Sequence, residues 1–321
     1  MINKLLTIAK NTFTETLRQP VYAVIIVATV LIFIISPSLT MFTLKDDNKL
    51  LQEIGLSTLF LAGLFIAIFT ASKAVSEEIE SKTISTVLAK PVQRPVFIIG
   101  KFFGVTAALV LEHYICSIAL LMMLRHGVLE SASDTHDWTV ISAGGVCILI
   151  TVFLTAFLNY FYDWKFSSTA IVTGAVTVTV AIVFLYFIDR NWRFNPAGNA
   201  ISIFNVYGSI LLLLGLVIFV AVAVALSTRF NIIVTLTFCI GIFLLGLVND
   251  YLFGRFADVY MWAKIGRAIL PNLQVFWISD AIYEGSEIPS KYLLISTSYA
   301  ACYATGIIFL SIALFQRRQV G

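Results

Sequence analysis

The chain has 321 residues, of which 59% are hydrophobic and 12% are charged. A typical soluble domain is about 45–50% apolar and about 25% charged. This excess of apolar side chains cannot be hidden in one globular core, so lipid must cover much of the surface, and the net charge of +3 is too small to indicate a nucleic-acid partner.

Residues 1–19 have the pattern of a helix that lies in the membrane interface. Their apolar side chains fall on one helical face, while the basic residues fall elsewhere. The apolar face consists of Ile2, Leu5, Leu6, Ala9, Phe13 and Leu17. We expect Pro20 to turn the chain into the first span. The alternative is a simple helical extension of that span.

Eight apolar runs are long enough to cross a bilayer, whose core of about 30 Å needs roughly 20 helical residues. They are 21–44, 54–74, 97–124, 140–162, 167–188, 204–226, 232–248 and 293–315. The sixth and seventh runs are the weakest because only the short turn 227–231 separates them. We therefore predict an all-α, polytopic membrane helix bundle over residues 20–321, with six spans as the alternative to eight.

The distribution of charge predicts the orientation, since Lys and Arg accumulate on the cytoplasmic side. With the N-terminus inside, the inner segments carry twelve basic and five acidic residues, against nine and twelve in the outer segments. We expect both termini to be cytoplasmic, in a cell membrane of the bacterial cytoplasmic type.

The most informative segment is the inner loop 75–96 between the second and third spans. Ser76 is a suitable N-cap, acidic residues fill the first turn, and Pro91 ends the helical pattern. We predict a short amphipathic helix, joined rigidly to two spans, that docks a cytosolic partner. The alternative is a solvated connector without a partner.

This loop resembles that of the permease subunits of ABC transporters of the type-2, mainly exporting, class. In that family it reads roughly E-x-E-x-G-T-hydrophobic-x-x-L-L-[SA]-x-P-[VI]-x-R, followed by apolar residues and G-K. The matching positions are Glu78, Glu80, Thr83, Ile84, Val87, Leu88, Ala89, Pro91, Val92, Arg94, Gly100 and Lys101. Lys82 stands where the family commonly has glycine, and the pair of runs over 140–188 is additional to the family's core of six spans.

The resemblance implies a transport subunit without an ATPase site of its own, which dimerises with a second permease copy or homologue. A separate cytosolic ABC ATPase would bind ATP and Mg²⁺, so this chain would need no cofactor. The residues implied in ATPase coupling are Glu78, Glu80, Thr83, Ile84, Val87, Leu88, Pro91 and Arg94. Consistently, the chain contains no G-x-x-x-x-G-K-[ST] phosphate-binding loop and no G-x-S-x-G or H-E-x-x-H motif.

Glu112 is the one charged side chain deep within a predicted span, and His113 follows it. Small residues recur every fourth position around Glu112, which is typical of a face along which helices pack closely. We expect Glu112 inside the bundle or at a dimer seam. Glu112 either forms a structural hydrogen bond between helices or contacts substrate or protons. If it contacts protons, the alternative function is a proton-coupled secondary transporter that uses Glu112 and His113.

Other polar residues carry weaker signals. Thr169, Thr173 and Thr177 either line a transport pathway or form hydrogen bonds between helices. In an outer loop, His126 and His136 accompany two aspartates and could hold a weakly bound cation, but we interpret them as solvated and predict no metal site. The four cysteines lie in apolar runs without a C-x-x-C pair, so we expect them to be core residues.

The outer segment 249–291 is rich in aromatic side chains, which favour the level of the lipid headgroups. We predict two short helices, about 255–270 and 272–283, broken at Pro271. They are expected to lie on the outer leaflet or dip into it.

Overall fold

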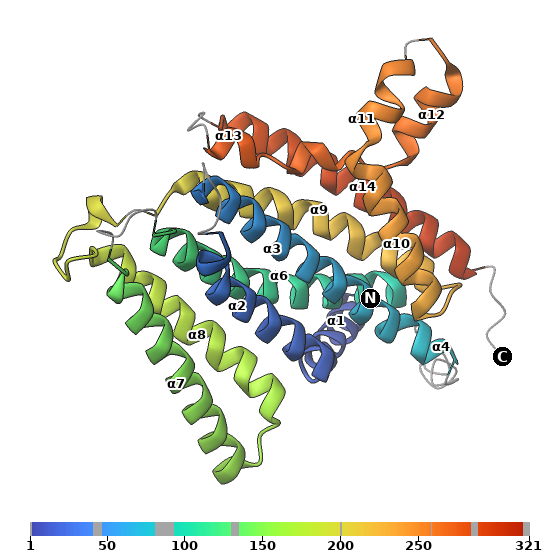
Figure 1. Ribbon diagram of the computed structural model, residues 1–321. Helices are drawn as coiled ribbons and strands as arrows, with labels where there is room; N and C mark the ends of the chain where they lie inside the picture. Colours follow the sequence, from blue (N-terminus) through green and yellow to red (C-terminus); the bar gives the residue numbers. More distant parts are fainter. Residues whose placement is uncertain are drawn as a thin grey trace.

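The computed structural model describes residues 2–40, 47–80, 93–129, 135–199, 201–257, 259–283 and 288–316, and within these ranges it contains helices and no β-strand beyond one isolated bridge between Ile188 and Phe194. Figure 1 shows the arrangement. The helices are α1 (Ile2–Leu17), α2 (Pro20–Thr40), α3 (Asp47–Ser72), α4 (Glu78–Glu80), α6 (Arg94–His126), α7 (Trp138–Tyr162), α8 (Phe166–Phe187), α9 (Ile203–Ser227), α10 (Ile232–Leu247), α11 (Asn249–Leu252), α12 (Met261–Ile269), α13 (Ser279–Tyr283) and α14 (Ser290–Gln316).

Seven of the described helices are long and apolar enough to cross a membrane. An eighth pass is formed if α10 is combined with residues 249–256, from which it is bent by 65°. The predicted fold class is therefore confirmed as a polytopic all-α bundle. Helices are expected in lipid because every backbone N–H and C=O group must find its partner within the segment.

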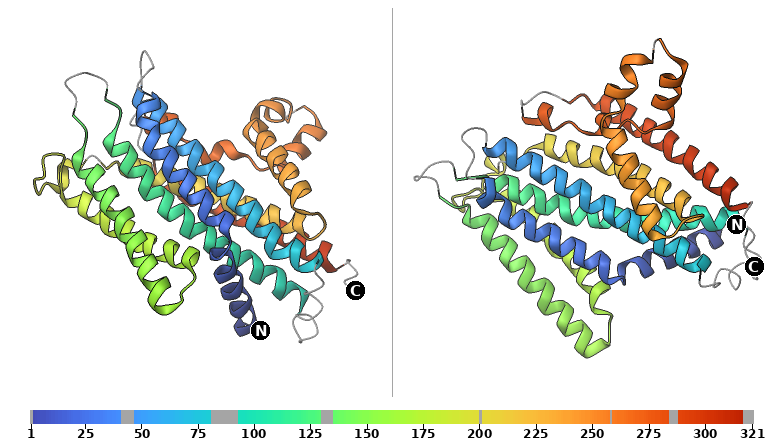
Figure 2. Two further views of the ribbon diagram at one scale, coloured as in Figure 1. Left: turned by 60° about the horizontal axis from the view of Figure 1, so that its bottom comes forward. Right: turned by 45° about the vertical axis from the view of Figure 1, so that its right-hand side comes forward.

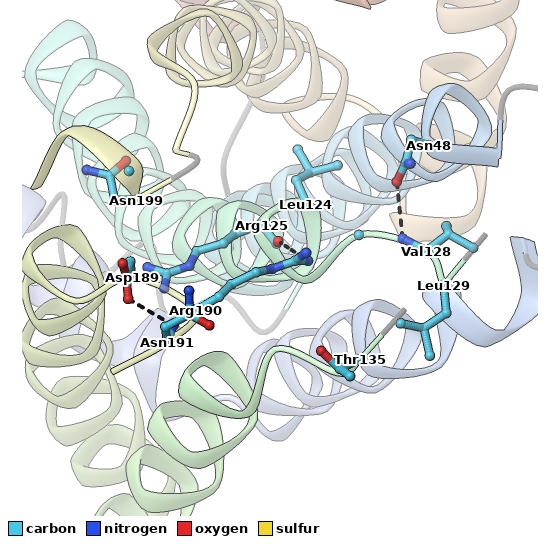
Figure 3. A pocket seen from close by; sticks show the side chains of 12 residues that line it. Asn48, Leu124, Arg125, Val128, Leu129, Thr135, Asp189, Arg190, Asn191 and Asn199 are labelled. Atoms are coloured by element: carbon cyan, nitrogen blue, oxygen red, sulfur yellow. Dashed lines mark hydrogen bonds between the residues drawn. The ribbon is translucent and has the colours of Figure 1, made fainter. Parts of the chain in front are cut away.

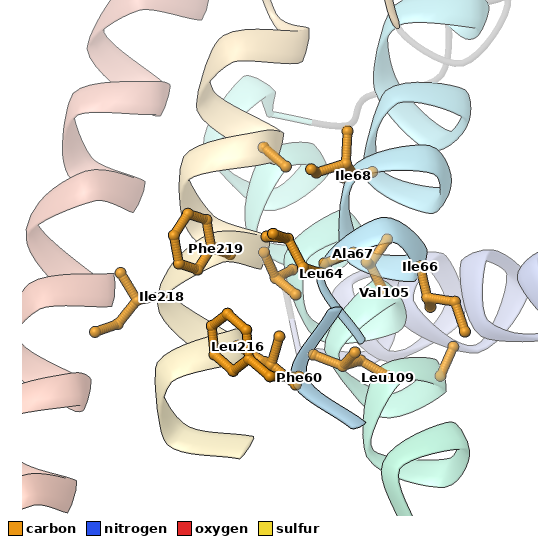
Figure 4. Close-up of a cluster of buried hydrophobic side chains, with 14 of the residues drawn as sticks. Phe60, Leu64, Ile66, Ala67, Ile68, Val105, Leu109, Leu216, Ile218 and Phe219 are labelled. Carbon is orange, nitrogen blue, oxygen red and sulfur yellow. The ribbon is translucent and has the colours of Figure 1, made fainter. Parts of the chain in front are cut away.

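The core of the bundle lies where α3, α6 and α9 meet (Figure 4). In α9 72% of the most apolar window is buried, against 17% in α7 and in α8. Phe60 of α3 stacks on Phe243 of α10, with ring centroids 5.4 Å apart, and meets Phe219 of α9 edge-on at 6.2 Å. The central helices are thus covered by protein, while the outer helices turn most of their apolar surface towards lipid.

Helices α7 and α8 form an antiparallel hairpin that diverges from the rest of the bundle (Figure 1). Hydroxyl groups join the two helices: Thr151 lies 2.7 Å from Thr177, and Thr155 lies 3.0 Å from Thr173. The turn between them passes through Asp163, whose φ of 54° lies in the left-handed region. The predicted runs 140–162 and 167–188 therefore pair with each other.

One end of the bundle gathers the start of α1, α4, the first turns of α6 and the ends of α9 and α14, and we call it the terminal end (Figure 2). The opposite end, with His126, Asp137 and the starts of α9 and α14, is the far end. An even number of passes between α2 and α14 agrees with this arrangement. Which end faces the cytosol remains a prediction from the charge distribution.

Helix α1 is separate from α2, as predicted for residues 1–19, and a helix in the membrane interface keeps apolar side chains available to lipid. Thr12 and Thr16 are buried together with Leu17, whereas Ile2 and Leu6 are 74% and 58% exposed. The reason lies in α6, where glycine leaves no side chain between the two backbones. Small α1 side chains therefore fit against α6, and the larger ones turn outwards.

The outer segment also departs from the prediction. The break at Pro271 is present, but the first helix, α12, begins only at Met261, and Asn249–Leu252 forms the separate helix α11. Beyond Pro271 the chain makes a 3₁₀ turn, Leu273–Phe276, and then the short helix α13 instead of one continuous helix. Phe276 is buried against the core, and seating it there favours a tight turn over a regular helix.

We predict that Gly104→Ala destabilises the protein. A Cβ atom at Gly104 would lie 2.6 Å from the carbonyl oxygen of Ala9 and 2.6 Å from Cβ of Thr12, so α1 would have to move. Overpacking of this kind costs about 1–3 kcal/mol. The matched control is Gly145→Ala in α7, where nothing lies within 4 Å of the new Cβ and helix propensity favours alanine by up to about 1 kcal/mol. Thermal unfolding in detergent checks this, and equal midpoints for the two variants would contradict it.

Candidate functional site

At the terminal end α3 does not stop at Ser72 but widens into a π-helical turn, Lys73–Glu77, which continues into α4. The expected N-cap at Ser76 is therefore wrong, because the chain is still helical on both sides of this residue. The apolar side chains of Ala74 and Val75 are buried, so the packing of the span continues past the predicted helix start. Single π-helical turns inside α-helices occur frequently at functional sites.

An ion pair joins this turn to α6. Lys101 Nζ lies 2.5 Å from Oε1 of Glu78 and 5.5 Å from the ring centroid of Phe97. The lysine side chain is 5% exposed and the glutamate side chain 24%. A charged pair so shielded from water is stronger than a surface pair and costs more to break.

Two arginines cap the C-terminal end of α14. Arg94 Nη1 donates to the carbonyl oxygens of Gln316 at 2.7 Å and Phe315 at 3.4 Å, and Arg229 Nη2 donates to that of Leu314 at 2.6 Å. The last carbonyl groups of a helix have no intrahelical partner and carry partial negative charge. The ring of Phe315 also stacks on Phe97, with centroids 5.8 Å apart. The first turn of α6 and the end of α14 are thus held together by charge and by packing.

These contacts form one group, which we call the anchor cluster: Glu78, Arg94, Phe97, Lys101, Arg229 and Phe315. The cluster lies on both sides of segment 81–92 and fixes the points where this segment leaves and rejoins the bundle. Arg229 and Phe315 were not predicted as site residues. The position of Arg229 in the short turn 227–231 could have indicated a role in capping a helix end, because basic side chains bind the last carbonyl groups of helices.

The sequence-predicted coupling residues fall into two groups. Glu78 and Arg94 belong to the anchor cluster, and Glu80 is the last residue of α4. The others lie outside the described residues: Thr83, Ile84, Val87, Leu88 and Pro91.

Glu112 and His113 occupy the middle of α6, and both are buried within the single chain. His113 Nε2 lies 2.9 Å from the carbonyl oxygen of Ser209 and 3.0 Å from its hydroxyl, so it ties α6 to α9. Neither carboxyl oxygen of Glu112 has a hydrogen-bond partner among the described residues. The two neighbours in sequence therefore have different surroundings, and only the histidine makes an interhelical hydrogen bond.

The threonines of α8 face the partner helix of the hairpin. Thr173 and Thr177 meet hydroxyl groups of α7, and Thr169 donates to the carbonyl oxygen of Lys165 at 2.9 Å. Of the two readings left open from the sequence, the contacts of Thr173 and Thr177 are those of hydrogen bonding between helices, whereas the contact of Thr169 lies within α8.

A second polar cluster fastens the α7–α8 hairpin to the far end of α6. The buried guanidinium group of Arg125 donates to Asp137 at 3.3 Å, to Thr139 at 3.0 Å and to the carbonyl oxygens of Leu185 and Ile188. Burial opposes ionisation of Asp137, but hydrogen bonds from Thr139 and Val140 together with the charge of Arg125 hold its pKa below the usual value. In the sequence, Arg125 counted only as one of the nine basic residues of the outer segments.

Next to this cluster lies a hollow of about 560 Å³ (Figure 3). Its lining is mainly polar and comes from the start of α3, the end of α6, the residues that follow α6 and precede α7, and the segment 189–199 after α8. The residues are Asn48, Leu124, Arg125, Gly127, Val128, Leu129, Thr135, Asp189, Arg190, Asn191, Gly198 and Asn199. Arg190 also reaches Asp137, at 3.4 Å, so the hairpin and α6 share one carboxylate.

The fold and the clustering of polar groups at the two ends define a polytopic α-helical membrane protein with an anchored loop at its terminal end. The family model for ABC-2 family transporter protein matches residues 6–161 of this chain. The match includes the loop whose pattern carries the resemblance, agrees with that resemblance and is consistent with an ABC-2 type permease. Such a permease is the transmembrane component and not the ATPase. No curated protein matches the chain.

We predict that Glu78 and Lys101 are energetically coupled. A double-mutant cycle with Glu78→Gln and Lys101→Met should give a coupling energy of about 1–3 kcal/mol, because the pair is largely shielded from solvent. The matched control is the pair Arg267 and Asp250, which lie 2.9 Å apart with side chains 51% and 38% exposed. Exposed pairs typically give about 0.2–1 kcal/mol. Denaturant unfolding in micelles measures both, and a coupling no larger than that of the control would count against the anchor cluster.

Proposed function

We propose that the chain is the membrane-spanning permease subunit of an ABC exporter, driven by a separate cytosolic ATPase that docks on loop 75–96. The observation that supports this most directly is the anchor cluster. It ties both ends of segment 81–92 to α3, α6 and α14. A solvated connector would not need such fixed ends. A segment that transmits movement of the ATPase to the helices would need them.

The proposed mechanism follows from the contacts at each end of the segment. A displacement of the segment would pass to α6 through Glu78 and Lys101, and to α14 through Arg94. The ATPase would bind ATP and Mg²⁺, and its closure would bias the bundle between two arrangements. In this proposal the surface that binds the ATPase consists of Glu80, Thr83, Ile84, Val87, Leu88 and Pro91.

The proposal includes a dimer with a second permease copy or homologue, in a cell membrane and with both termini in the cytosol. The charge distribution supports this orientation, since the anchor cluster and segment 81–92 then lie on the side richer in basic residues. Export, as opposed to import, is supported by the resemblance to the type-2 class.

A second candidate function is proton-coupled transport through Glu112 and His113. Its supporting observation is the fully buried carboxyl group of Glu112, which lacks a hydrogen-bond partner in the described part of the bundle. Ionisable groups within a membrane are costly and are often functional. Against it, Nε2 of His113 is already engaged by Ser209 of α9.

We predict that Leu88→Asp abolishes assembly with the ATPase, because a charge replaces an apolar residue on the proposed docking surface. Purification from native membranes in mild detergent should recover the wild-type chain with a polypeptide of ATPase size and with ATP hydrolysis. Recovery of hydrolysis should fall at least about tenfold in the variant, which corresponds to about 1.4 kcal/mol.

The matched control for this experiment is Trp164→Asp, in the exposed turn between α7 and α8. This change also places a carboxylate on a loop, but outside loop 75–96 and the anchor cluster, and assembly should be unchanged. Assembly that survives Leu88→Asp, or labelling of Lys82 and Lys90 from outside the cell, would overturn the proposed docking.

We predict that Glu112→Gln leaves ATP hydrolysis by the reconstituted complex within about twofold of wild type. Glutamine keeps the shape of the side chain and removes its ability to carry a proton. A pH-sensitive dye enclosed in the vesicles reports proton movement, and Glu53→Gln in α3 is the matched control. Proton uptake that Glu112→Gln abolishes and Glu53→Gln preserves would instead support the second candidate.

A further inference from the structure

Two of the three histidines in the chain face each other at the far end. His126 is the last residue of α6, and His136 lies just before Trp138, where α7 begins. The Nε2 atom of His126 and the Nδ1 atom of His136 are 3.3 Å apart, and the ring centroids are 5.5 Å apart. His136 is exposed and His126 is half-buried, so water and solutes reach the space between the two rings.

The hydrogen bond on the other nitrogen of His126 determines its tautomer. Nδ1 of His126 lies 2.8 Å from the carbonyl oxygen of Gly127, and a carbonyl oxygen can only accept. Nδ1 therefore carries the proton, and Nε2 presents its lone pair towards His136. Histidines that bind metals are held in the same way, with the second ring nitrogen donating to a backbone carbonyl or a carboxylate.

The separation of the two nitrogens fits a shared metal ion. Zinc binds imidazole nitrogen at about 2.0–2.1 Å, and two ligands of a tetrahedral ion at that distance lie roughly 3.3 Å apart. The observed separation is 3.3 Å.

We propose that His126 and His136 form a two-histidine binding site for a divalent transition-metal ion of the Zn²⁺ type, with water completing the coordination. Within the described residues no group of three His, Cys, Asp or Glu side chains gathers that could hold a metal. The site is therefore open, and it binds metal more weakly than a closed structural site with four protein ligands. Asp137 remains with Arg125 and Arg190 and offsets one of their two positive charges beside the site.

The bound ion would cross-link the end of α6 to the start of α7 across residues 127–135. Arg125 already holds α7 and α8 at this corner, so the metal would act on the same junction and stiffen it. This inference does not depend on the proposed transport function, because it concerns binding at the far end, away from the anchor cluster.

Isothermal titration of the purified full-length protein with Zn²⁺ tests the proposal. We expect saturable binding of one ion per chain and no response to Mg²⁺, which prefers oxygen ligands. His136→Ala and His126→Ala should each weaken binding at least about tenfold, and Thr135→Ala is the matched control, since it changes an exposed neighbour and keeps both imidazoles.

Size-exclusion elution identical to wild type shows that each variant is folded. His136→Ala is decisive, because its exposed side chain can be removed without opening the core. Wild-type affinity for Zn²⁺ in His136→Ala, or the absence of saturable Zn²⁺ binding in the wild type, would contradict the proposed metal site. The contact between the two rings would then be a direct hydrogen bond.

Discussion

Hydrocarbon does not tolerate polar groups without partners, and this constraint governs every level of the structure. It makes the spans helical, because only a helix satisfies its own backbone. It also governs many of the hydroxyl groups inside the spans, which donate to the carbonyl oxygen four residues earlier, as Thr70 does with Ile66 at 2.6 Å. The carboxyl group of Glu112 is an exception. Most of the charged groups that remain lie at the two ends of the bundle, where carbonyl groups and counter-ions meet them.

Helix α6 connects these two polar ends. Its first turns carry Arg94 and Lys101, which bind α14 and the end of α3. Its last turn carries Arg125 and His126, which contact the start of α7. Between them, glycines and other small residues let α1 and α2 approach closely, so the neighbours contact α6 mainly by packing. In the proposed mechanism a force applied at the terminal end would therefore reach the α7–α8 hairpin through α6.

The sequence predicted the spans well, but it did not predict the contacts of α1 or the helix bounds of segment 249–291, for a physical reason. A span is a local property, since length and apolar content alone decide whether residues such as 97–124 can cross a bilayer. The face that α1 packs depends instead on Gly104, nearly one hundred positions further along the chain. The helix after Pro271 depends on where Phe276 finds its place in the core. Neither relation is visible in local periodicity.

The candidate site shows the same division. Glu78 and Arg94 could be predicted because a local pattern marks them, but their partners are remote: Arg94 binds carbonyl groups of α14 that lie more than 200 residues away. Every residue has a backbone carbonyl, so no sequence motif can predict which carbonyl will be the partner. The same holds for Arg125 at the carbonyl groups of Leu185 and Ile188. Basic residues at helix ends are therefore the ones whose roles depend most on tertiary structure, and in this protein such residues hold both ends of α6.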